Sequence, residues 1–173
     1  MQGKWPRASF PNLTYGPNQN HRITSCFSTR YNCIAWAADD PRRWWWPETY
    51  TAYWPSNALN EVSPAAFVSA FETLGYVPCA DGSLETNFEK VAIYVNSDGE
   101  PTHAARQLRN GKWTSKLGNF EDITHNALLD VADGPAPDGY GRPKYYLKRR
   151  RKLINTLRRY FVWLLVEVWE RAT

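Results

Sequence analysis

The sequence predicts a single α+β domain in which N-terminal helices pack on a small antiparallel sheet, with one more helix at the C-terminus. Two observations predict this class. Apolar residues recur at helical spacing within residues 64–74, and from residue 89 onward the apolar pattern changes to a period of two. Because the helices precede the strands and do not alternate with them, the order indicates an α+β fold, and 173 residues suffice for one core.

Two helices are predicted ahead of the sheet. Asn32 can cap a short helix over residues 33–38 through its side-chain oxygen. The second helix has three boundary signals, since Ser63 can cap it, Pro64 stands at its first position and Gly75 ends it.

Two segments outside these helices are predicted to be irregular. Residues 1–31 show no period and are expected to form ordered coil lying on the body. Residues 39–60 combine prolines with tryptophans, which indicates a loop anchored by aromatic rings. These rings either line a groove for a peptide, sugar or lipid chain or belong to the core, and core anchoring is the favoured interpretation. The tryptophans concerned are Trp44, Trp45, Trp46 and Trp54.

The sheet is predicted from alternating runs that form a three-stranded meander. The three predicted strands span residues 89–95, 101–109 and 112–118. A turn joins the first strand to the second, and an Asn-Gly sequence typical of a hairpin joins the second to the third. Asp122 is expected to cap a short helix over residues 122–131, and residues 142–148 are predicted to form one more strand.

Positive charge is concentrated at the C-terminus. Residues 1–147 hold 13 Lys+Arg and 15 Asp+Glu, whereas residues 148–173 hold 8 and 2. We therefore expect a domain over residues 1–148 and a separate basic, apolar helix over residues 149–173. The apolar stretch at 160–169 is too short to span a bilayer. Packing or homodimerisation is the first expectation for this helix, a membrane surface the second, and nucleic acid the least favoured partner.

Composition excludes several classes of protein. With 43% hydrophobic and 15% aromatic residues, the chain is not disordered. Three cysteines without a CxxC motif argue against a disulfide or zinc framework, and no cofactor or metal is predicted. The N-terminus lacks the apolar stretch of a secretory signal, so a cytoplasmic location is expected, with peripheral membrane attachment as an alternative.

Cys33 is the candidate nucleophile because it opens a predicted helix. Unpaired N–H groups and the helix dipole favour a thiolate at that position. Catalysis also needs an imidazole from another element, and His103 on the predicted middle strand is the best candidate. A third polar group should come from the strand across the hairpin, which offers Thr114, Ser115 and Lys116, with Asn119 just beyond. The rival reading is a buried structural cysteine.

Several blocks resemble known families. YNCIAWA, RRWWWP, AFETLGYVPC, FEKVAIYV, PTHAARQL and WTSKLG resemble, in this order, an uncharacterised family of bacterial proteins over roughly residues 20–148. A cysteine that opens a helix, followed about 70 residues later by a histidine on an antiparallel meander, also resembles papain-like thiol hydrolases.

The papain-like resemblance implies a papain-like fold and acyl transfer at an amide or peptide bond, in a hydrolase or an acyltransferase. Cys33 would be the nucleophile and His103 the general base. The backbone N–H of Cys33, with Gln19 or Asn20, would hold the oxyanion.

The third catalytic position departs from the papain-like pattern. Enzymes of that type place Asn, Asp, Gln or a second His there, whereas this chain offers Ser115, with Asp122 or Asn119 as substitutes. A Cys–His dyad or a triad would follow. The alternative function is a non-catalytic interaction module that binds a partner or a membrane surface through its aromatic loop and its C-terminal helix.

Overall fold

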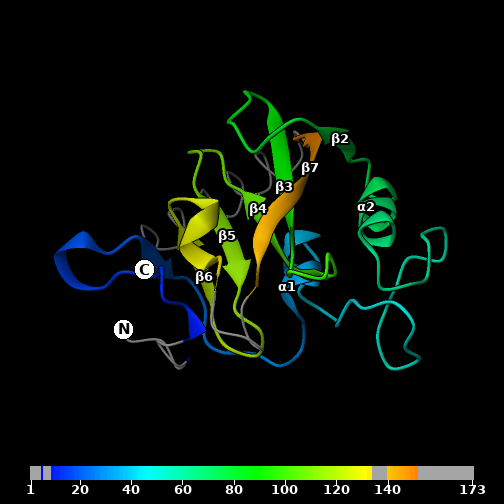
Figure 1. Ribbon diagram of the computed structural model, residues 1–173, viewed down its shortest axis with the longest axis horizontal. Coiled ribbons are helices and arrows are strands. Elements are labelled where there is room, and N and C mark those ends of the chain that lie inside the picture. The colour runs from blue at the N-terminus through cyan, green and yellow to red at the C-terminus, as the bar shows by residue number, and fades with distance from the viewer. Residues whose placement is uncertain (1–4, 6–8, 134–139, 152–173) are drawn as a thin grey trace, which may run out of the picture.

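One seven-stranded antiparallel sheet dominates the computed structural model, which describes residues 5, 9–133 and 140–151 (Figure 1). The strands lie in the order β1-β6-β5-β4-β3-β7-β2. Their bounds are β1 (His21–Ile23), β2 (Val77–Cys79), β3 (Phe88–Val95), β4 (Pro101–Gln107), β5 (Trp113–Lys116), β6 (Asp122–His125) and β7 (Arg142–Arg150). The helices are α1 (Cys33–Ala37), α2 (Pro64–Glu72) and the 3-10 turns η2 (Gly16–Asn18) and η3 (Leu128–Val131).

The predicted papain-like α+β fold, with helices packed on a small sheet, is wrong. In the described ranges the fold is β-rich, and its two α-helices have only five and nine residues. Strands β1 and β2 have three residues each, too few for an alternation of apolar and polar residues to be recognised in the sequence. Asp122 begins strand β6 and does not cap a helix, so the helix predicted at 122–131 is a strand followed by η3. Residues 149 and 150, the predicted start of the C-terminal helix, belong to strand β7, and residues 152–173 of that predicted helix lie outside the described residues.

Elements with strong local signals were predicted correctly. The side chain of Asn32 accepts a hydrogen bond from the backbone of Ala35 at the start of α1, and Ser63 caps α2 through the backbone N–H of Ala66. The three strands of the meander correspond to β3, β4 and β5, and the last predicted strand corresponds to β7.

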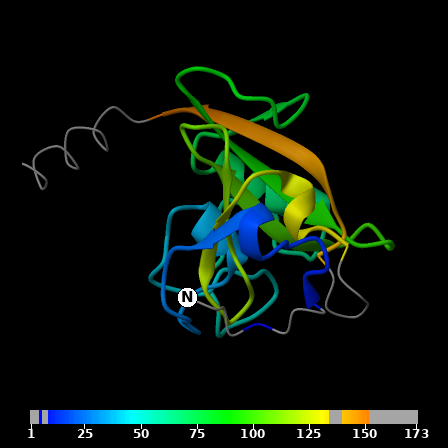
Figure 2. The same cartoon turned by 90° about the vertical axis from the view of Figure 1, so that its left-hand side faces the viewer.

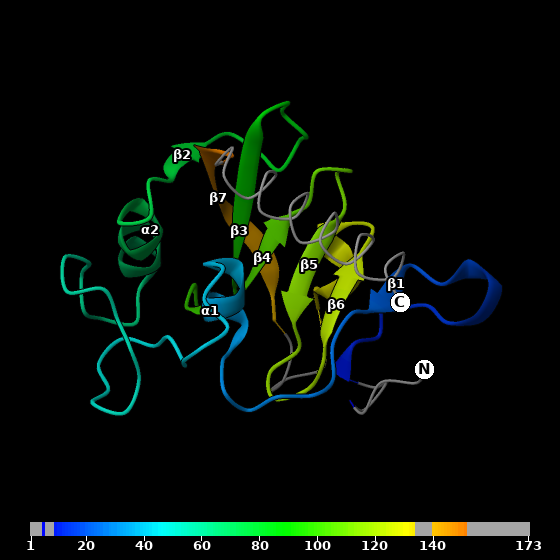
Figure 3. The same ribbon diagram turned by 180° about the vertical axis from the view of Figure 1, so that it is seen from behind.

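Each face of the sheet has a core of its own. Helix α1 packs on β4 and β5, and α2 packs on β7, β2 and β3 (Figure 3). We call this side the helix face, and its core contains Cys33, Ile93 and Ala104. The opposite face is covered by the N-terminal segment and η3, and its core contains Tyr94 and Ala105. Since successive strand residues point to opposite sides, neighbours in the sequence belong to different cores.

Several charged segments meet at one end of the sheet. Because the strands are antiparallel, β3 begins, β4 ends, β5 begins and β7 ends at this end. The loop over residues 80–87 lies there too, at the top of Figures 1 and 2, close to the end of β7 (orange).

Candidate functional site

Cys33 is buried beneath the sheet at the first position of α1. Its residue is 6% exposed, and its Sγ lies 4.0 Å from the carbonyl oxygen of Thr102 on β4. Burial raises the pKa of the thiol to about 11, and nearby N–H groups, among them that of Ala104, offset burial only in part. At neutral pH Cys33 is therefore a protonated thiol within the helix-face core.

His103 belongs to the opposite face. It lies directly across from Tyr94, with 5.0 Å between the ring centroids, and stacks on Tyr140 at 3.9 Å. Its Nε2 bonds to Ser115, and its Nδ1 has no hydrogen-bond partner in the described ranges. Cys33 and His103 therefore form no hydrogen-bonded dyad here, and their catalytic roles stay predictions.

Ser115 connects two buried histidines. Its Oγ lies 3.0 Å from Nε2 of His103 and 2.9 Å from Nε2 of His125. Nδ1 of His125 lies 2.7 Å from the Ala127 carbonyl oxygen, so this nitrogen is the donor, and Nε2 accepts from the Ser115 hydroxyl. The Ser115 oxygen in turn accepts the Nε2–H of His103. Burial lowers the pKa of His103 well below its usual value and that of His125 to about 4, so both rings are neutral.

Lys116 and Asp122 form the polar group on the helix face, where they lie opposite one another on β5 and β6. Burial lowers the pKa of Lys116, and the positive charge of Lys116 in turn favours the thiolate of Cys33. Asp122 accepts a hydrogen bond of 2.6 Å from the hydroxyl of Tyr31, and burial raises the pKa of Asp122. Asp122 is thus partnered by Tyr31 and not by His103.

The predicted oxyanion residues lie near the far edge of the sheet. Nε2 of Gln19 donates to the carbonyl of His21 at 2.7 Å, and Nδ2 of Asn20 donates to the carbonyl of Asn12 at 2.9 Å. Both precede β1, which is separated from β4 by β6 and β5. The structure therefore does not bring Gln19 or Asn20 to Cys33.

The predicted groove tryptophans are mostly packing residues. Trp45 is buried, and its Nε1 donates to Asp40 at 3.1 Å. Trp46 and Trp54 pack on Phe67 of α2, with centroid distances of 5.4 and 5.1 Å. Trp44 is half-buried. Their contacts attach the loop to the helix-face core.

Two of the hollows on the described surface lie near β7, and neither is lined by Cys33 or His103. One, of about 520 Å³, lies between η3 and the start of β7, and the other, of about 340 Å³, borders the start of β7. No set of three or more His, Cys, Asp or Glu side chains in the described part of the chain is placed to hold a metal ion. Within the same part, no helix has the length and apolar character needed to cross a bilayer.

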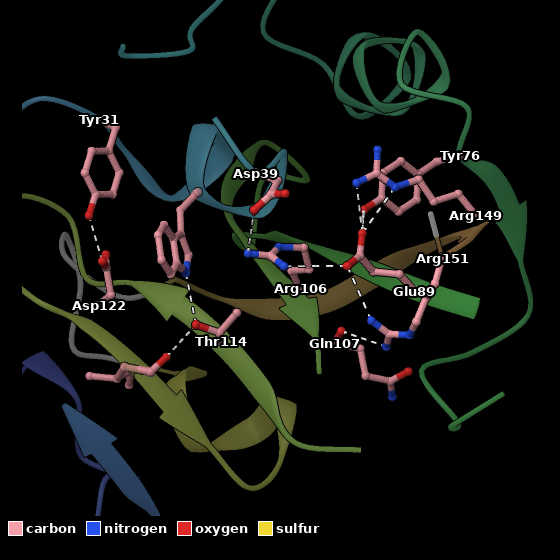
Figure 4. A network of polar contacts seen from close by, with 12 residues as sticks. Tyr31, Asp39, Tyr76, Glu89, Arg106, Gln107, Thr114, Asp122, Arg149 and Arg151 are labelled. Atoms are coloured by element: carbon pink, nitrogen blue, oxygen red, sulfur yellow. Dashed lines mark hydrogen bonds and ion pairs between the residues drawn. The ribbon is translucent and has the colours of Figure 1, made fainter. Parts of the chain in front are cut away.

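Sequence reasoning missed a cluster of arginines around Glu89 (Figure 4). Glu89 Oε1 accepts from the hydroxyl of Tyr76 at 2.7 Å and from Nη2 of Arg149 at 2.9 Å. Its Oε2 lies 3.5 Å from Nη1 of Arg106 and 3.4 Å from Nη1 of Arg151. Three guanidinium groups from β4, β7 and the residue after β7 thus share one carboxylate. We call these four charged residues the arginine cluster.

Positive charge exceeds negative charge in this cluster. Burial raises the pKa of Glu89, but the charges of Arg106 and Arg149 and the Tyr76 hydrogen bond outweigh burial, so this pKa is lowered. Asp39, which is half exposed, supplies a second carboxylate to Arg106 at 3.2 Å. Nε of Arg106 is buried and has no hydrogen-bond partner in the described ranges. Three guanidinium groups thus face two carboxylates, which leaves a net positive charge.

A signal for this cluster exists in the sequence. Arg149 and Arg151 are two residues apart, so on a strand they point to the same face, and Glu89 is paired with Arg149 across β3 and β7. The basic run at residues 148–152 was predicted to form the start of a helix. With that assignment, the two-residue spacing of Arg149 and Arg151 was not recognised as a strand pattern.

More positive charge surrounds the cluster on the surface. Arg109 and Lys112 in the β4–β5 turn and Arg150 at the end of β7 are exposed. Lys148 is half-buried and bonds to Glu85 at 2.7 Å. We call these four basic residues, together with the arginine cluster, the basic end of the sheet.

Comparison with known proteins places most of the chain in one family. No curated protein and no solved structure matches the chain. A link to papain-like hydrolases therefore has no support, whereas the predicted membership of an uncharacterised family over roughly residues 20–148 is confirmed. A family model matches residues 22–148, and the chain belongs to that family, which is described as Domain of unknown function (DUF7689).

Proposed function

We propose that this chain is a non-catalytic binding module that uses the basic end of the sheet to bind an anionic partner. The observation that carries the proposal is the sharing of Glu89 by three arginines on the helix face. Exposed Arg109 lies in the turn at the same end of the sheet, and exposed Arg150 lies at that end on the other face of β7. Guanidinium groups bind phosphate, sulfate and carboxylate oxygens through forked hydrogen bonds. Clustered positive charge also attracts anions over several ångströms.

The rigidity of this region supports a binding role. Glu89 connects β3 to β4 and β7, and Nη2 of Arg151 donates to the carbonyl of Gln107 at 3.1 Å. Cations held on such a connected framework lose little conformational entropy when a partner arrives.

The state of Cys33 also favours binding over catalysis. A thiol nucleophile reacts as its thiolate, whereas burial raises the pKa of Cys33 to about 11. His103 is engaged with Ser115, and both are fully buried.

A thiol hydrolase or acyltransferase acting on an amide or peptide is the second candidate. One observation favours it, because the N–H groups of Ala104, Ile34 and Cys33 and the charge of Lys116 all favour a thiolate at this sulfur. The reaction would require an open state that exposes Cys33. A peripheral membrane location and a homodimer, both predicted above, remain proposals.

Binding of the full chain to a fluorescent heparin oligosaccharide tests the first proposal. Arg109→Glu and Arg150→Glu should each weaken the affinity on the order of tenfold at low salt, because each removes a cation and adds an anion. Arg22→Glu is the matched control, since Arg22 is exposed on the distant strand β1, and its affinity should stay within about twofold of wild type. Equal losses in all three variants, or no binding by the wild type, would overturn the proposal.

A further inference from the structure

We infer that the anionic partner is the surface of an anionic phospholipid bilayer, an inference that rests on the proposed binding function. The surface that would contact lipid mixes basic and apolar side chains at the basic end of the sheet, on the face of β7 opposite to the arginine cluster. It consists of Val77, Leu84, Phe88, Lys148 and Arg150, and we call it the docking surface.

Strand pairing brings four of these side chains to one face. Val77 lies directly across from Lys148, and Phe88 directly across from Arg150. Lys148 and Arg150 are two residues apart on β7, so they point the same way. Nζ of Lys148 lies 4.9 Å and Cζ of Arg150 5.7 Å from the centroid of the Phe88 ring. The side chain of Leu84 lies beside Gly111 in the β4–β5 turn at the same end of the sheet, and the next residue, Glu85, bonds to Lys148.

The apolar members are exposed enough to enter a lipid interface. Val77 is 55% and Leu84 53% exposed, although both are aliphatic. Aliphatic side chains lower their free energy by entering the boundary between headgroups and acyl chains, while neighbouring Lys and Arg side chains reach the phosphates. The docking surface offers both interactions side by side.

The same side chains are poorly suited to a nucleic acid. Recognition of single strands uses aromatic faces on which bases stack. Here Lys148 and Arg150 already lie over the ring of Phe88. Val77 and Leu84 offer a polyanion no hydrogen bond and no stacking face. A bilayer accommodates all five side chains of the docking surface.

The sequence that follows continues the same chemistry. After Arg151 it is first basic and then rich in Trp, Leu and Val, with "RRYFVWLLVEVW" at residues 158–169. This composition is typical of segments that lie in a membrane interface. Positive charge next to such a segment strengthens attraction to anionic lipids.

Co-sedimentation of the full chain with lipid vesicles tests the inference. The chain should bind vesicles containing about one third phosphatidylserine and should bind pure phosphatidylcholine vesicles at least about tenfold more weakly. Val77→Ser and Leu84→Ser should each weaken binding to anionic vesicles by about threefold or more, through loss of apolar burial, and should leave heparin affinity unchanged. Leu59→Ser is the matched control, because Leu59 is 52% exposed in a different loop.

Each outcome decides between the proposals. Binding to heparin without binding to anionic vesicles overturns the bilayer inference and leaves the proposed function standing. Failure to bind both overturns the two together. Equal effects of Leu59→Ser and Leu84→Ser on vesicle binding would show that the docking surface is not the contact, and tighter binding to a DNA duplex than to vesicles would assign the surface to nucleic acid.

Discussion

Glu89 pairs with three arginine side chains through its single carboxylate. Replacing it by glutamine leaves Arg106, Arg149 and Arg151 close together without their shared carboxylate. Removing one partner of a buried ion pair typically costs about 3–5 kcal/mol. We therefore expect Glu89→Gln to lower the free energy of unfolding in urea by about 3 kcal/mol. Glu100→Gln, an exposed control in the β3–β4 turn, should change it by less than about 0.5 kcal/mol, and equal effects would contradict the assigned role.

Cys33 should be slow to react in the native protein. With a pKa near 11 it holds about 100-fold less thiolate at pH 8 than an ordinary cysteine, and burial slows reaction further. Exposed Cys26 serves as the internal reference. Mass spectrometry after a short iodoacetamide pulse should find Cys26 modified and Cys33 intact. Rapid modification of Cys33 below neutral pH would favour the thiol hydrolase.

Part of the arrangement of the candidate site residues was predictable from the sequence. The contact between His103 and Ser115 follows from reading the Asn-Gly turn as a hairpin, which brings β4 and β5 together. The separation of Cys33 from His103 was not predictable, because the sequence does not reveal which face of the sheet α1 covers. Residues 103 and 104 point to opposite faces, and it is Ala104 that shares a core with Cys33.

Among the strands, β7 is directly preceded by a glycine, Gly141, that its contacts require. Gly141 has φ 65°, and a Cβ at this position would lie 1.9 Å from the carbonyl oxygen of Val95. Gly99 has a similar φ of 84° but open space around it. Gly99→Ala should cost about 1 kcal/mol of stability through backbone strain alone. Gly141→Ala should cost at least about 3 kcal/mol in the same urea titration, since a clash is added, and equal costs would refute this packing.

The buried histidines His103 on β4 and His125 on β6 predict a loss of stability in acid. In the folded state the pKa of His125 is about 4, below its ordinary value of 6.5. As the pH falls from 6.5 toward 4, the His125 ring is protonated in the unfolded chain but stays neutral in the folded chain, so the free energy of unfolding decreases. At pH 4.5 the loss relative to pH 7.5 should be about 2 kcal/mol from this group. His125→Gln should remove about that much of the pH dependence, and an unchanged pH dependence would contradict the assignment.

Which elements were predictable depended on local chemistry. Helices α1 and α2 carry capping side chains at Asn32 and Ser63, and the meander carries a hairpin signal. Strands β1 and β2 have three residues each and owe their conformation to pairing with β6 and β7, which are distant in sequence. Local pattern cannot reveal such pairing, and for this reason the sheet was predicted too small.

At the scale of the whole molecule, the two faces of the sheet hold different polar groups. The opposite face holds the neutral histidine chain, while the helix face holds the arginine cluster and Lys116. Among the described residues, three arginines share one carboxylate where β4 and β7 end, and exposed basic side chains surround them there. The described part of the chain is thus a β-rich domain with basic side chains gathered at one end of its sheet.

Heparin affinity measured side by side for Cys33→Ala and for the double variant Arg109→Glu/Arg150→Glu tests this account most directly, with folding of both checked by circular dichroism. We predict that Cys33→Ala binds as tightly as wild type and that the double variant binds about 100-fold more weakly. Unchanged affinity in the double variant, or a comparable loss in Cys33→Ala, would contradict the account.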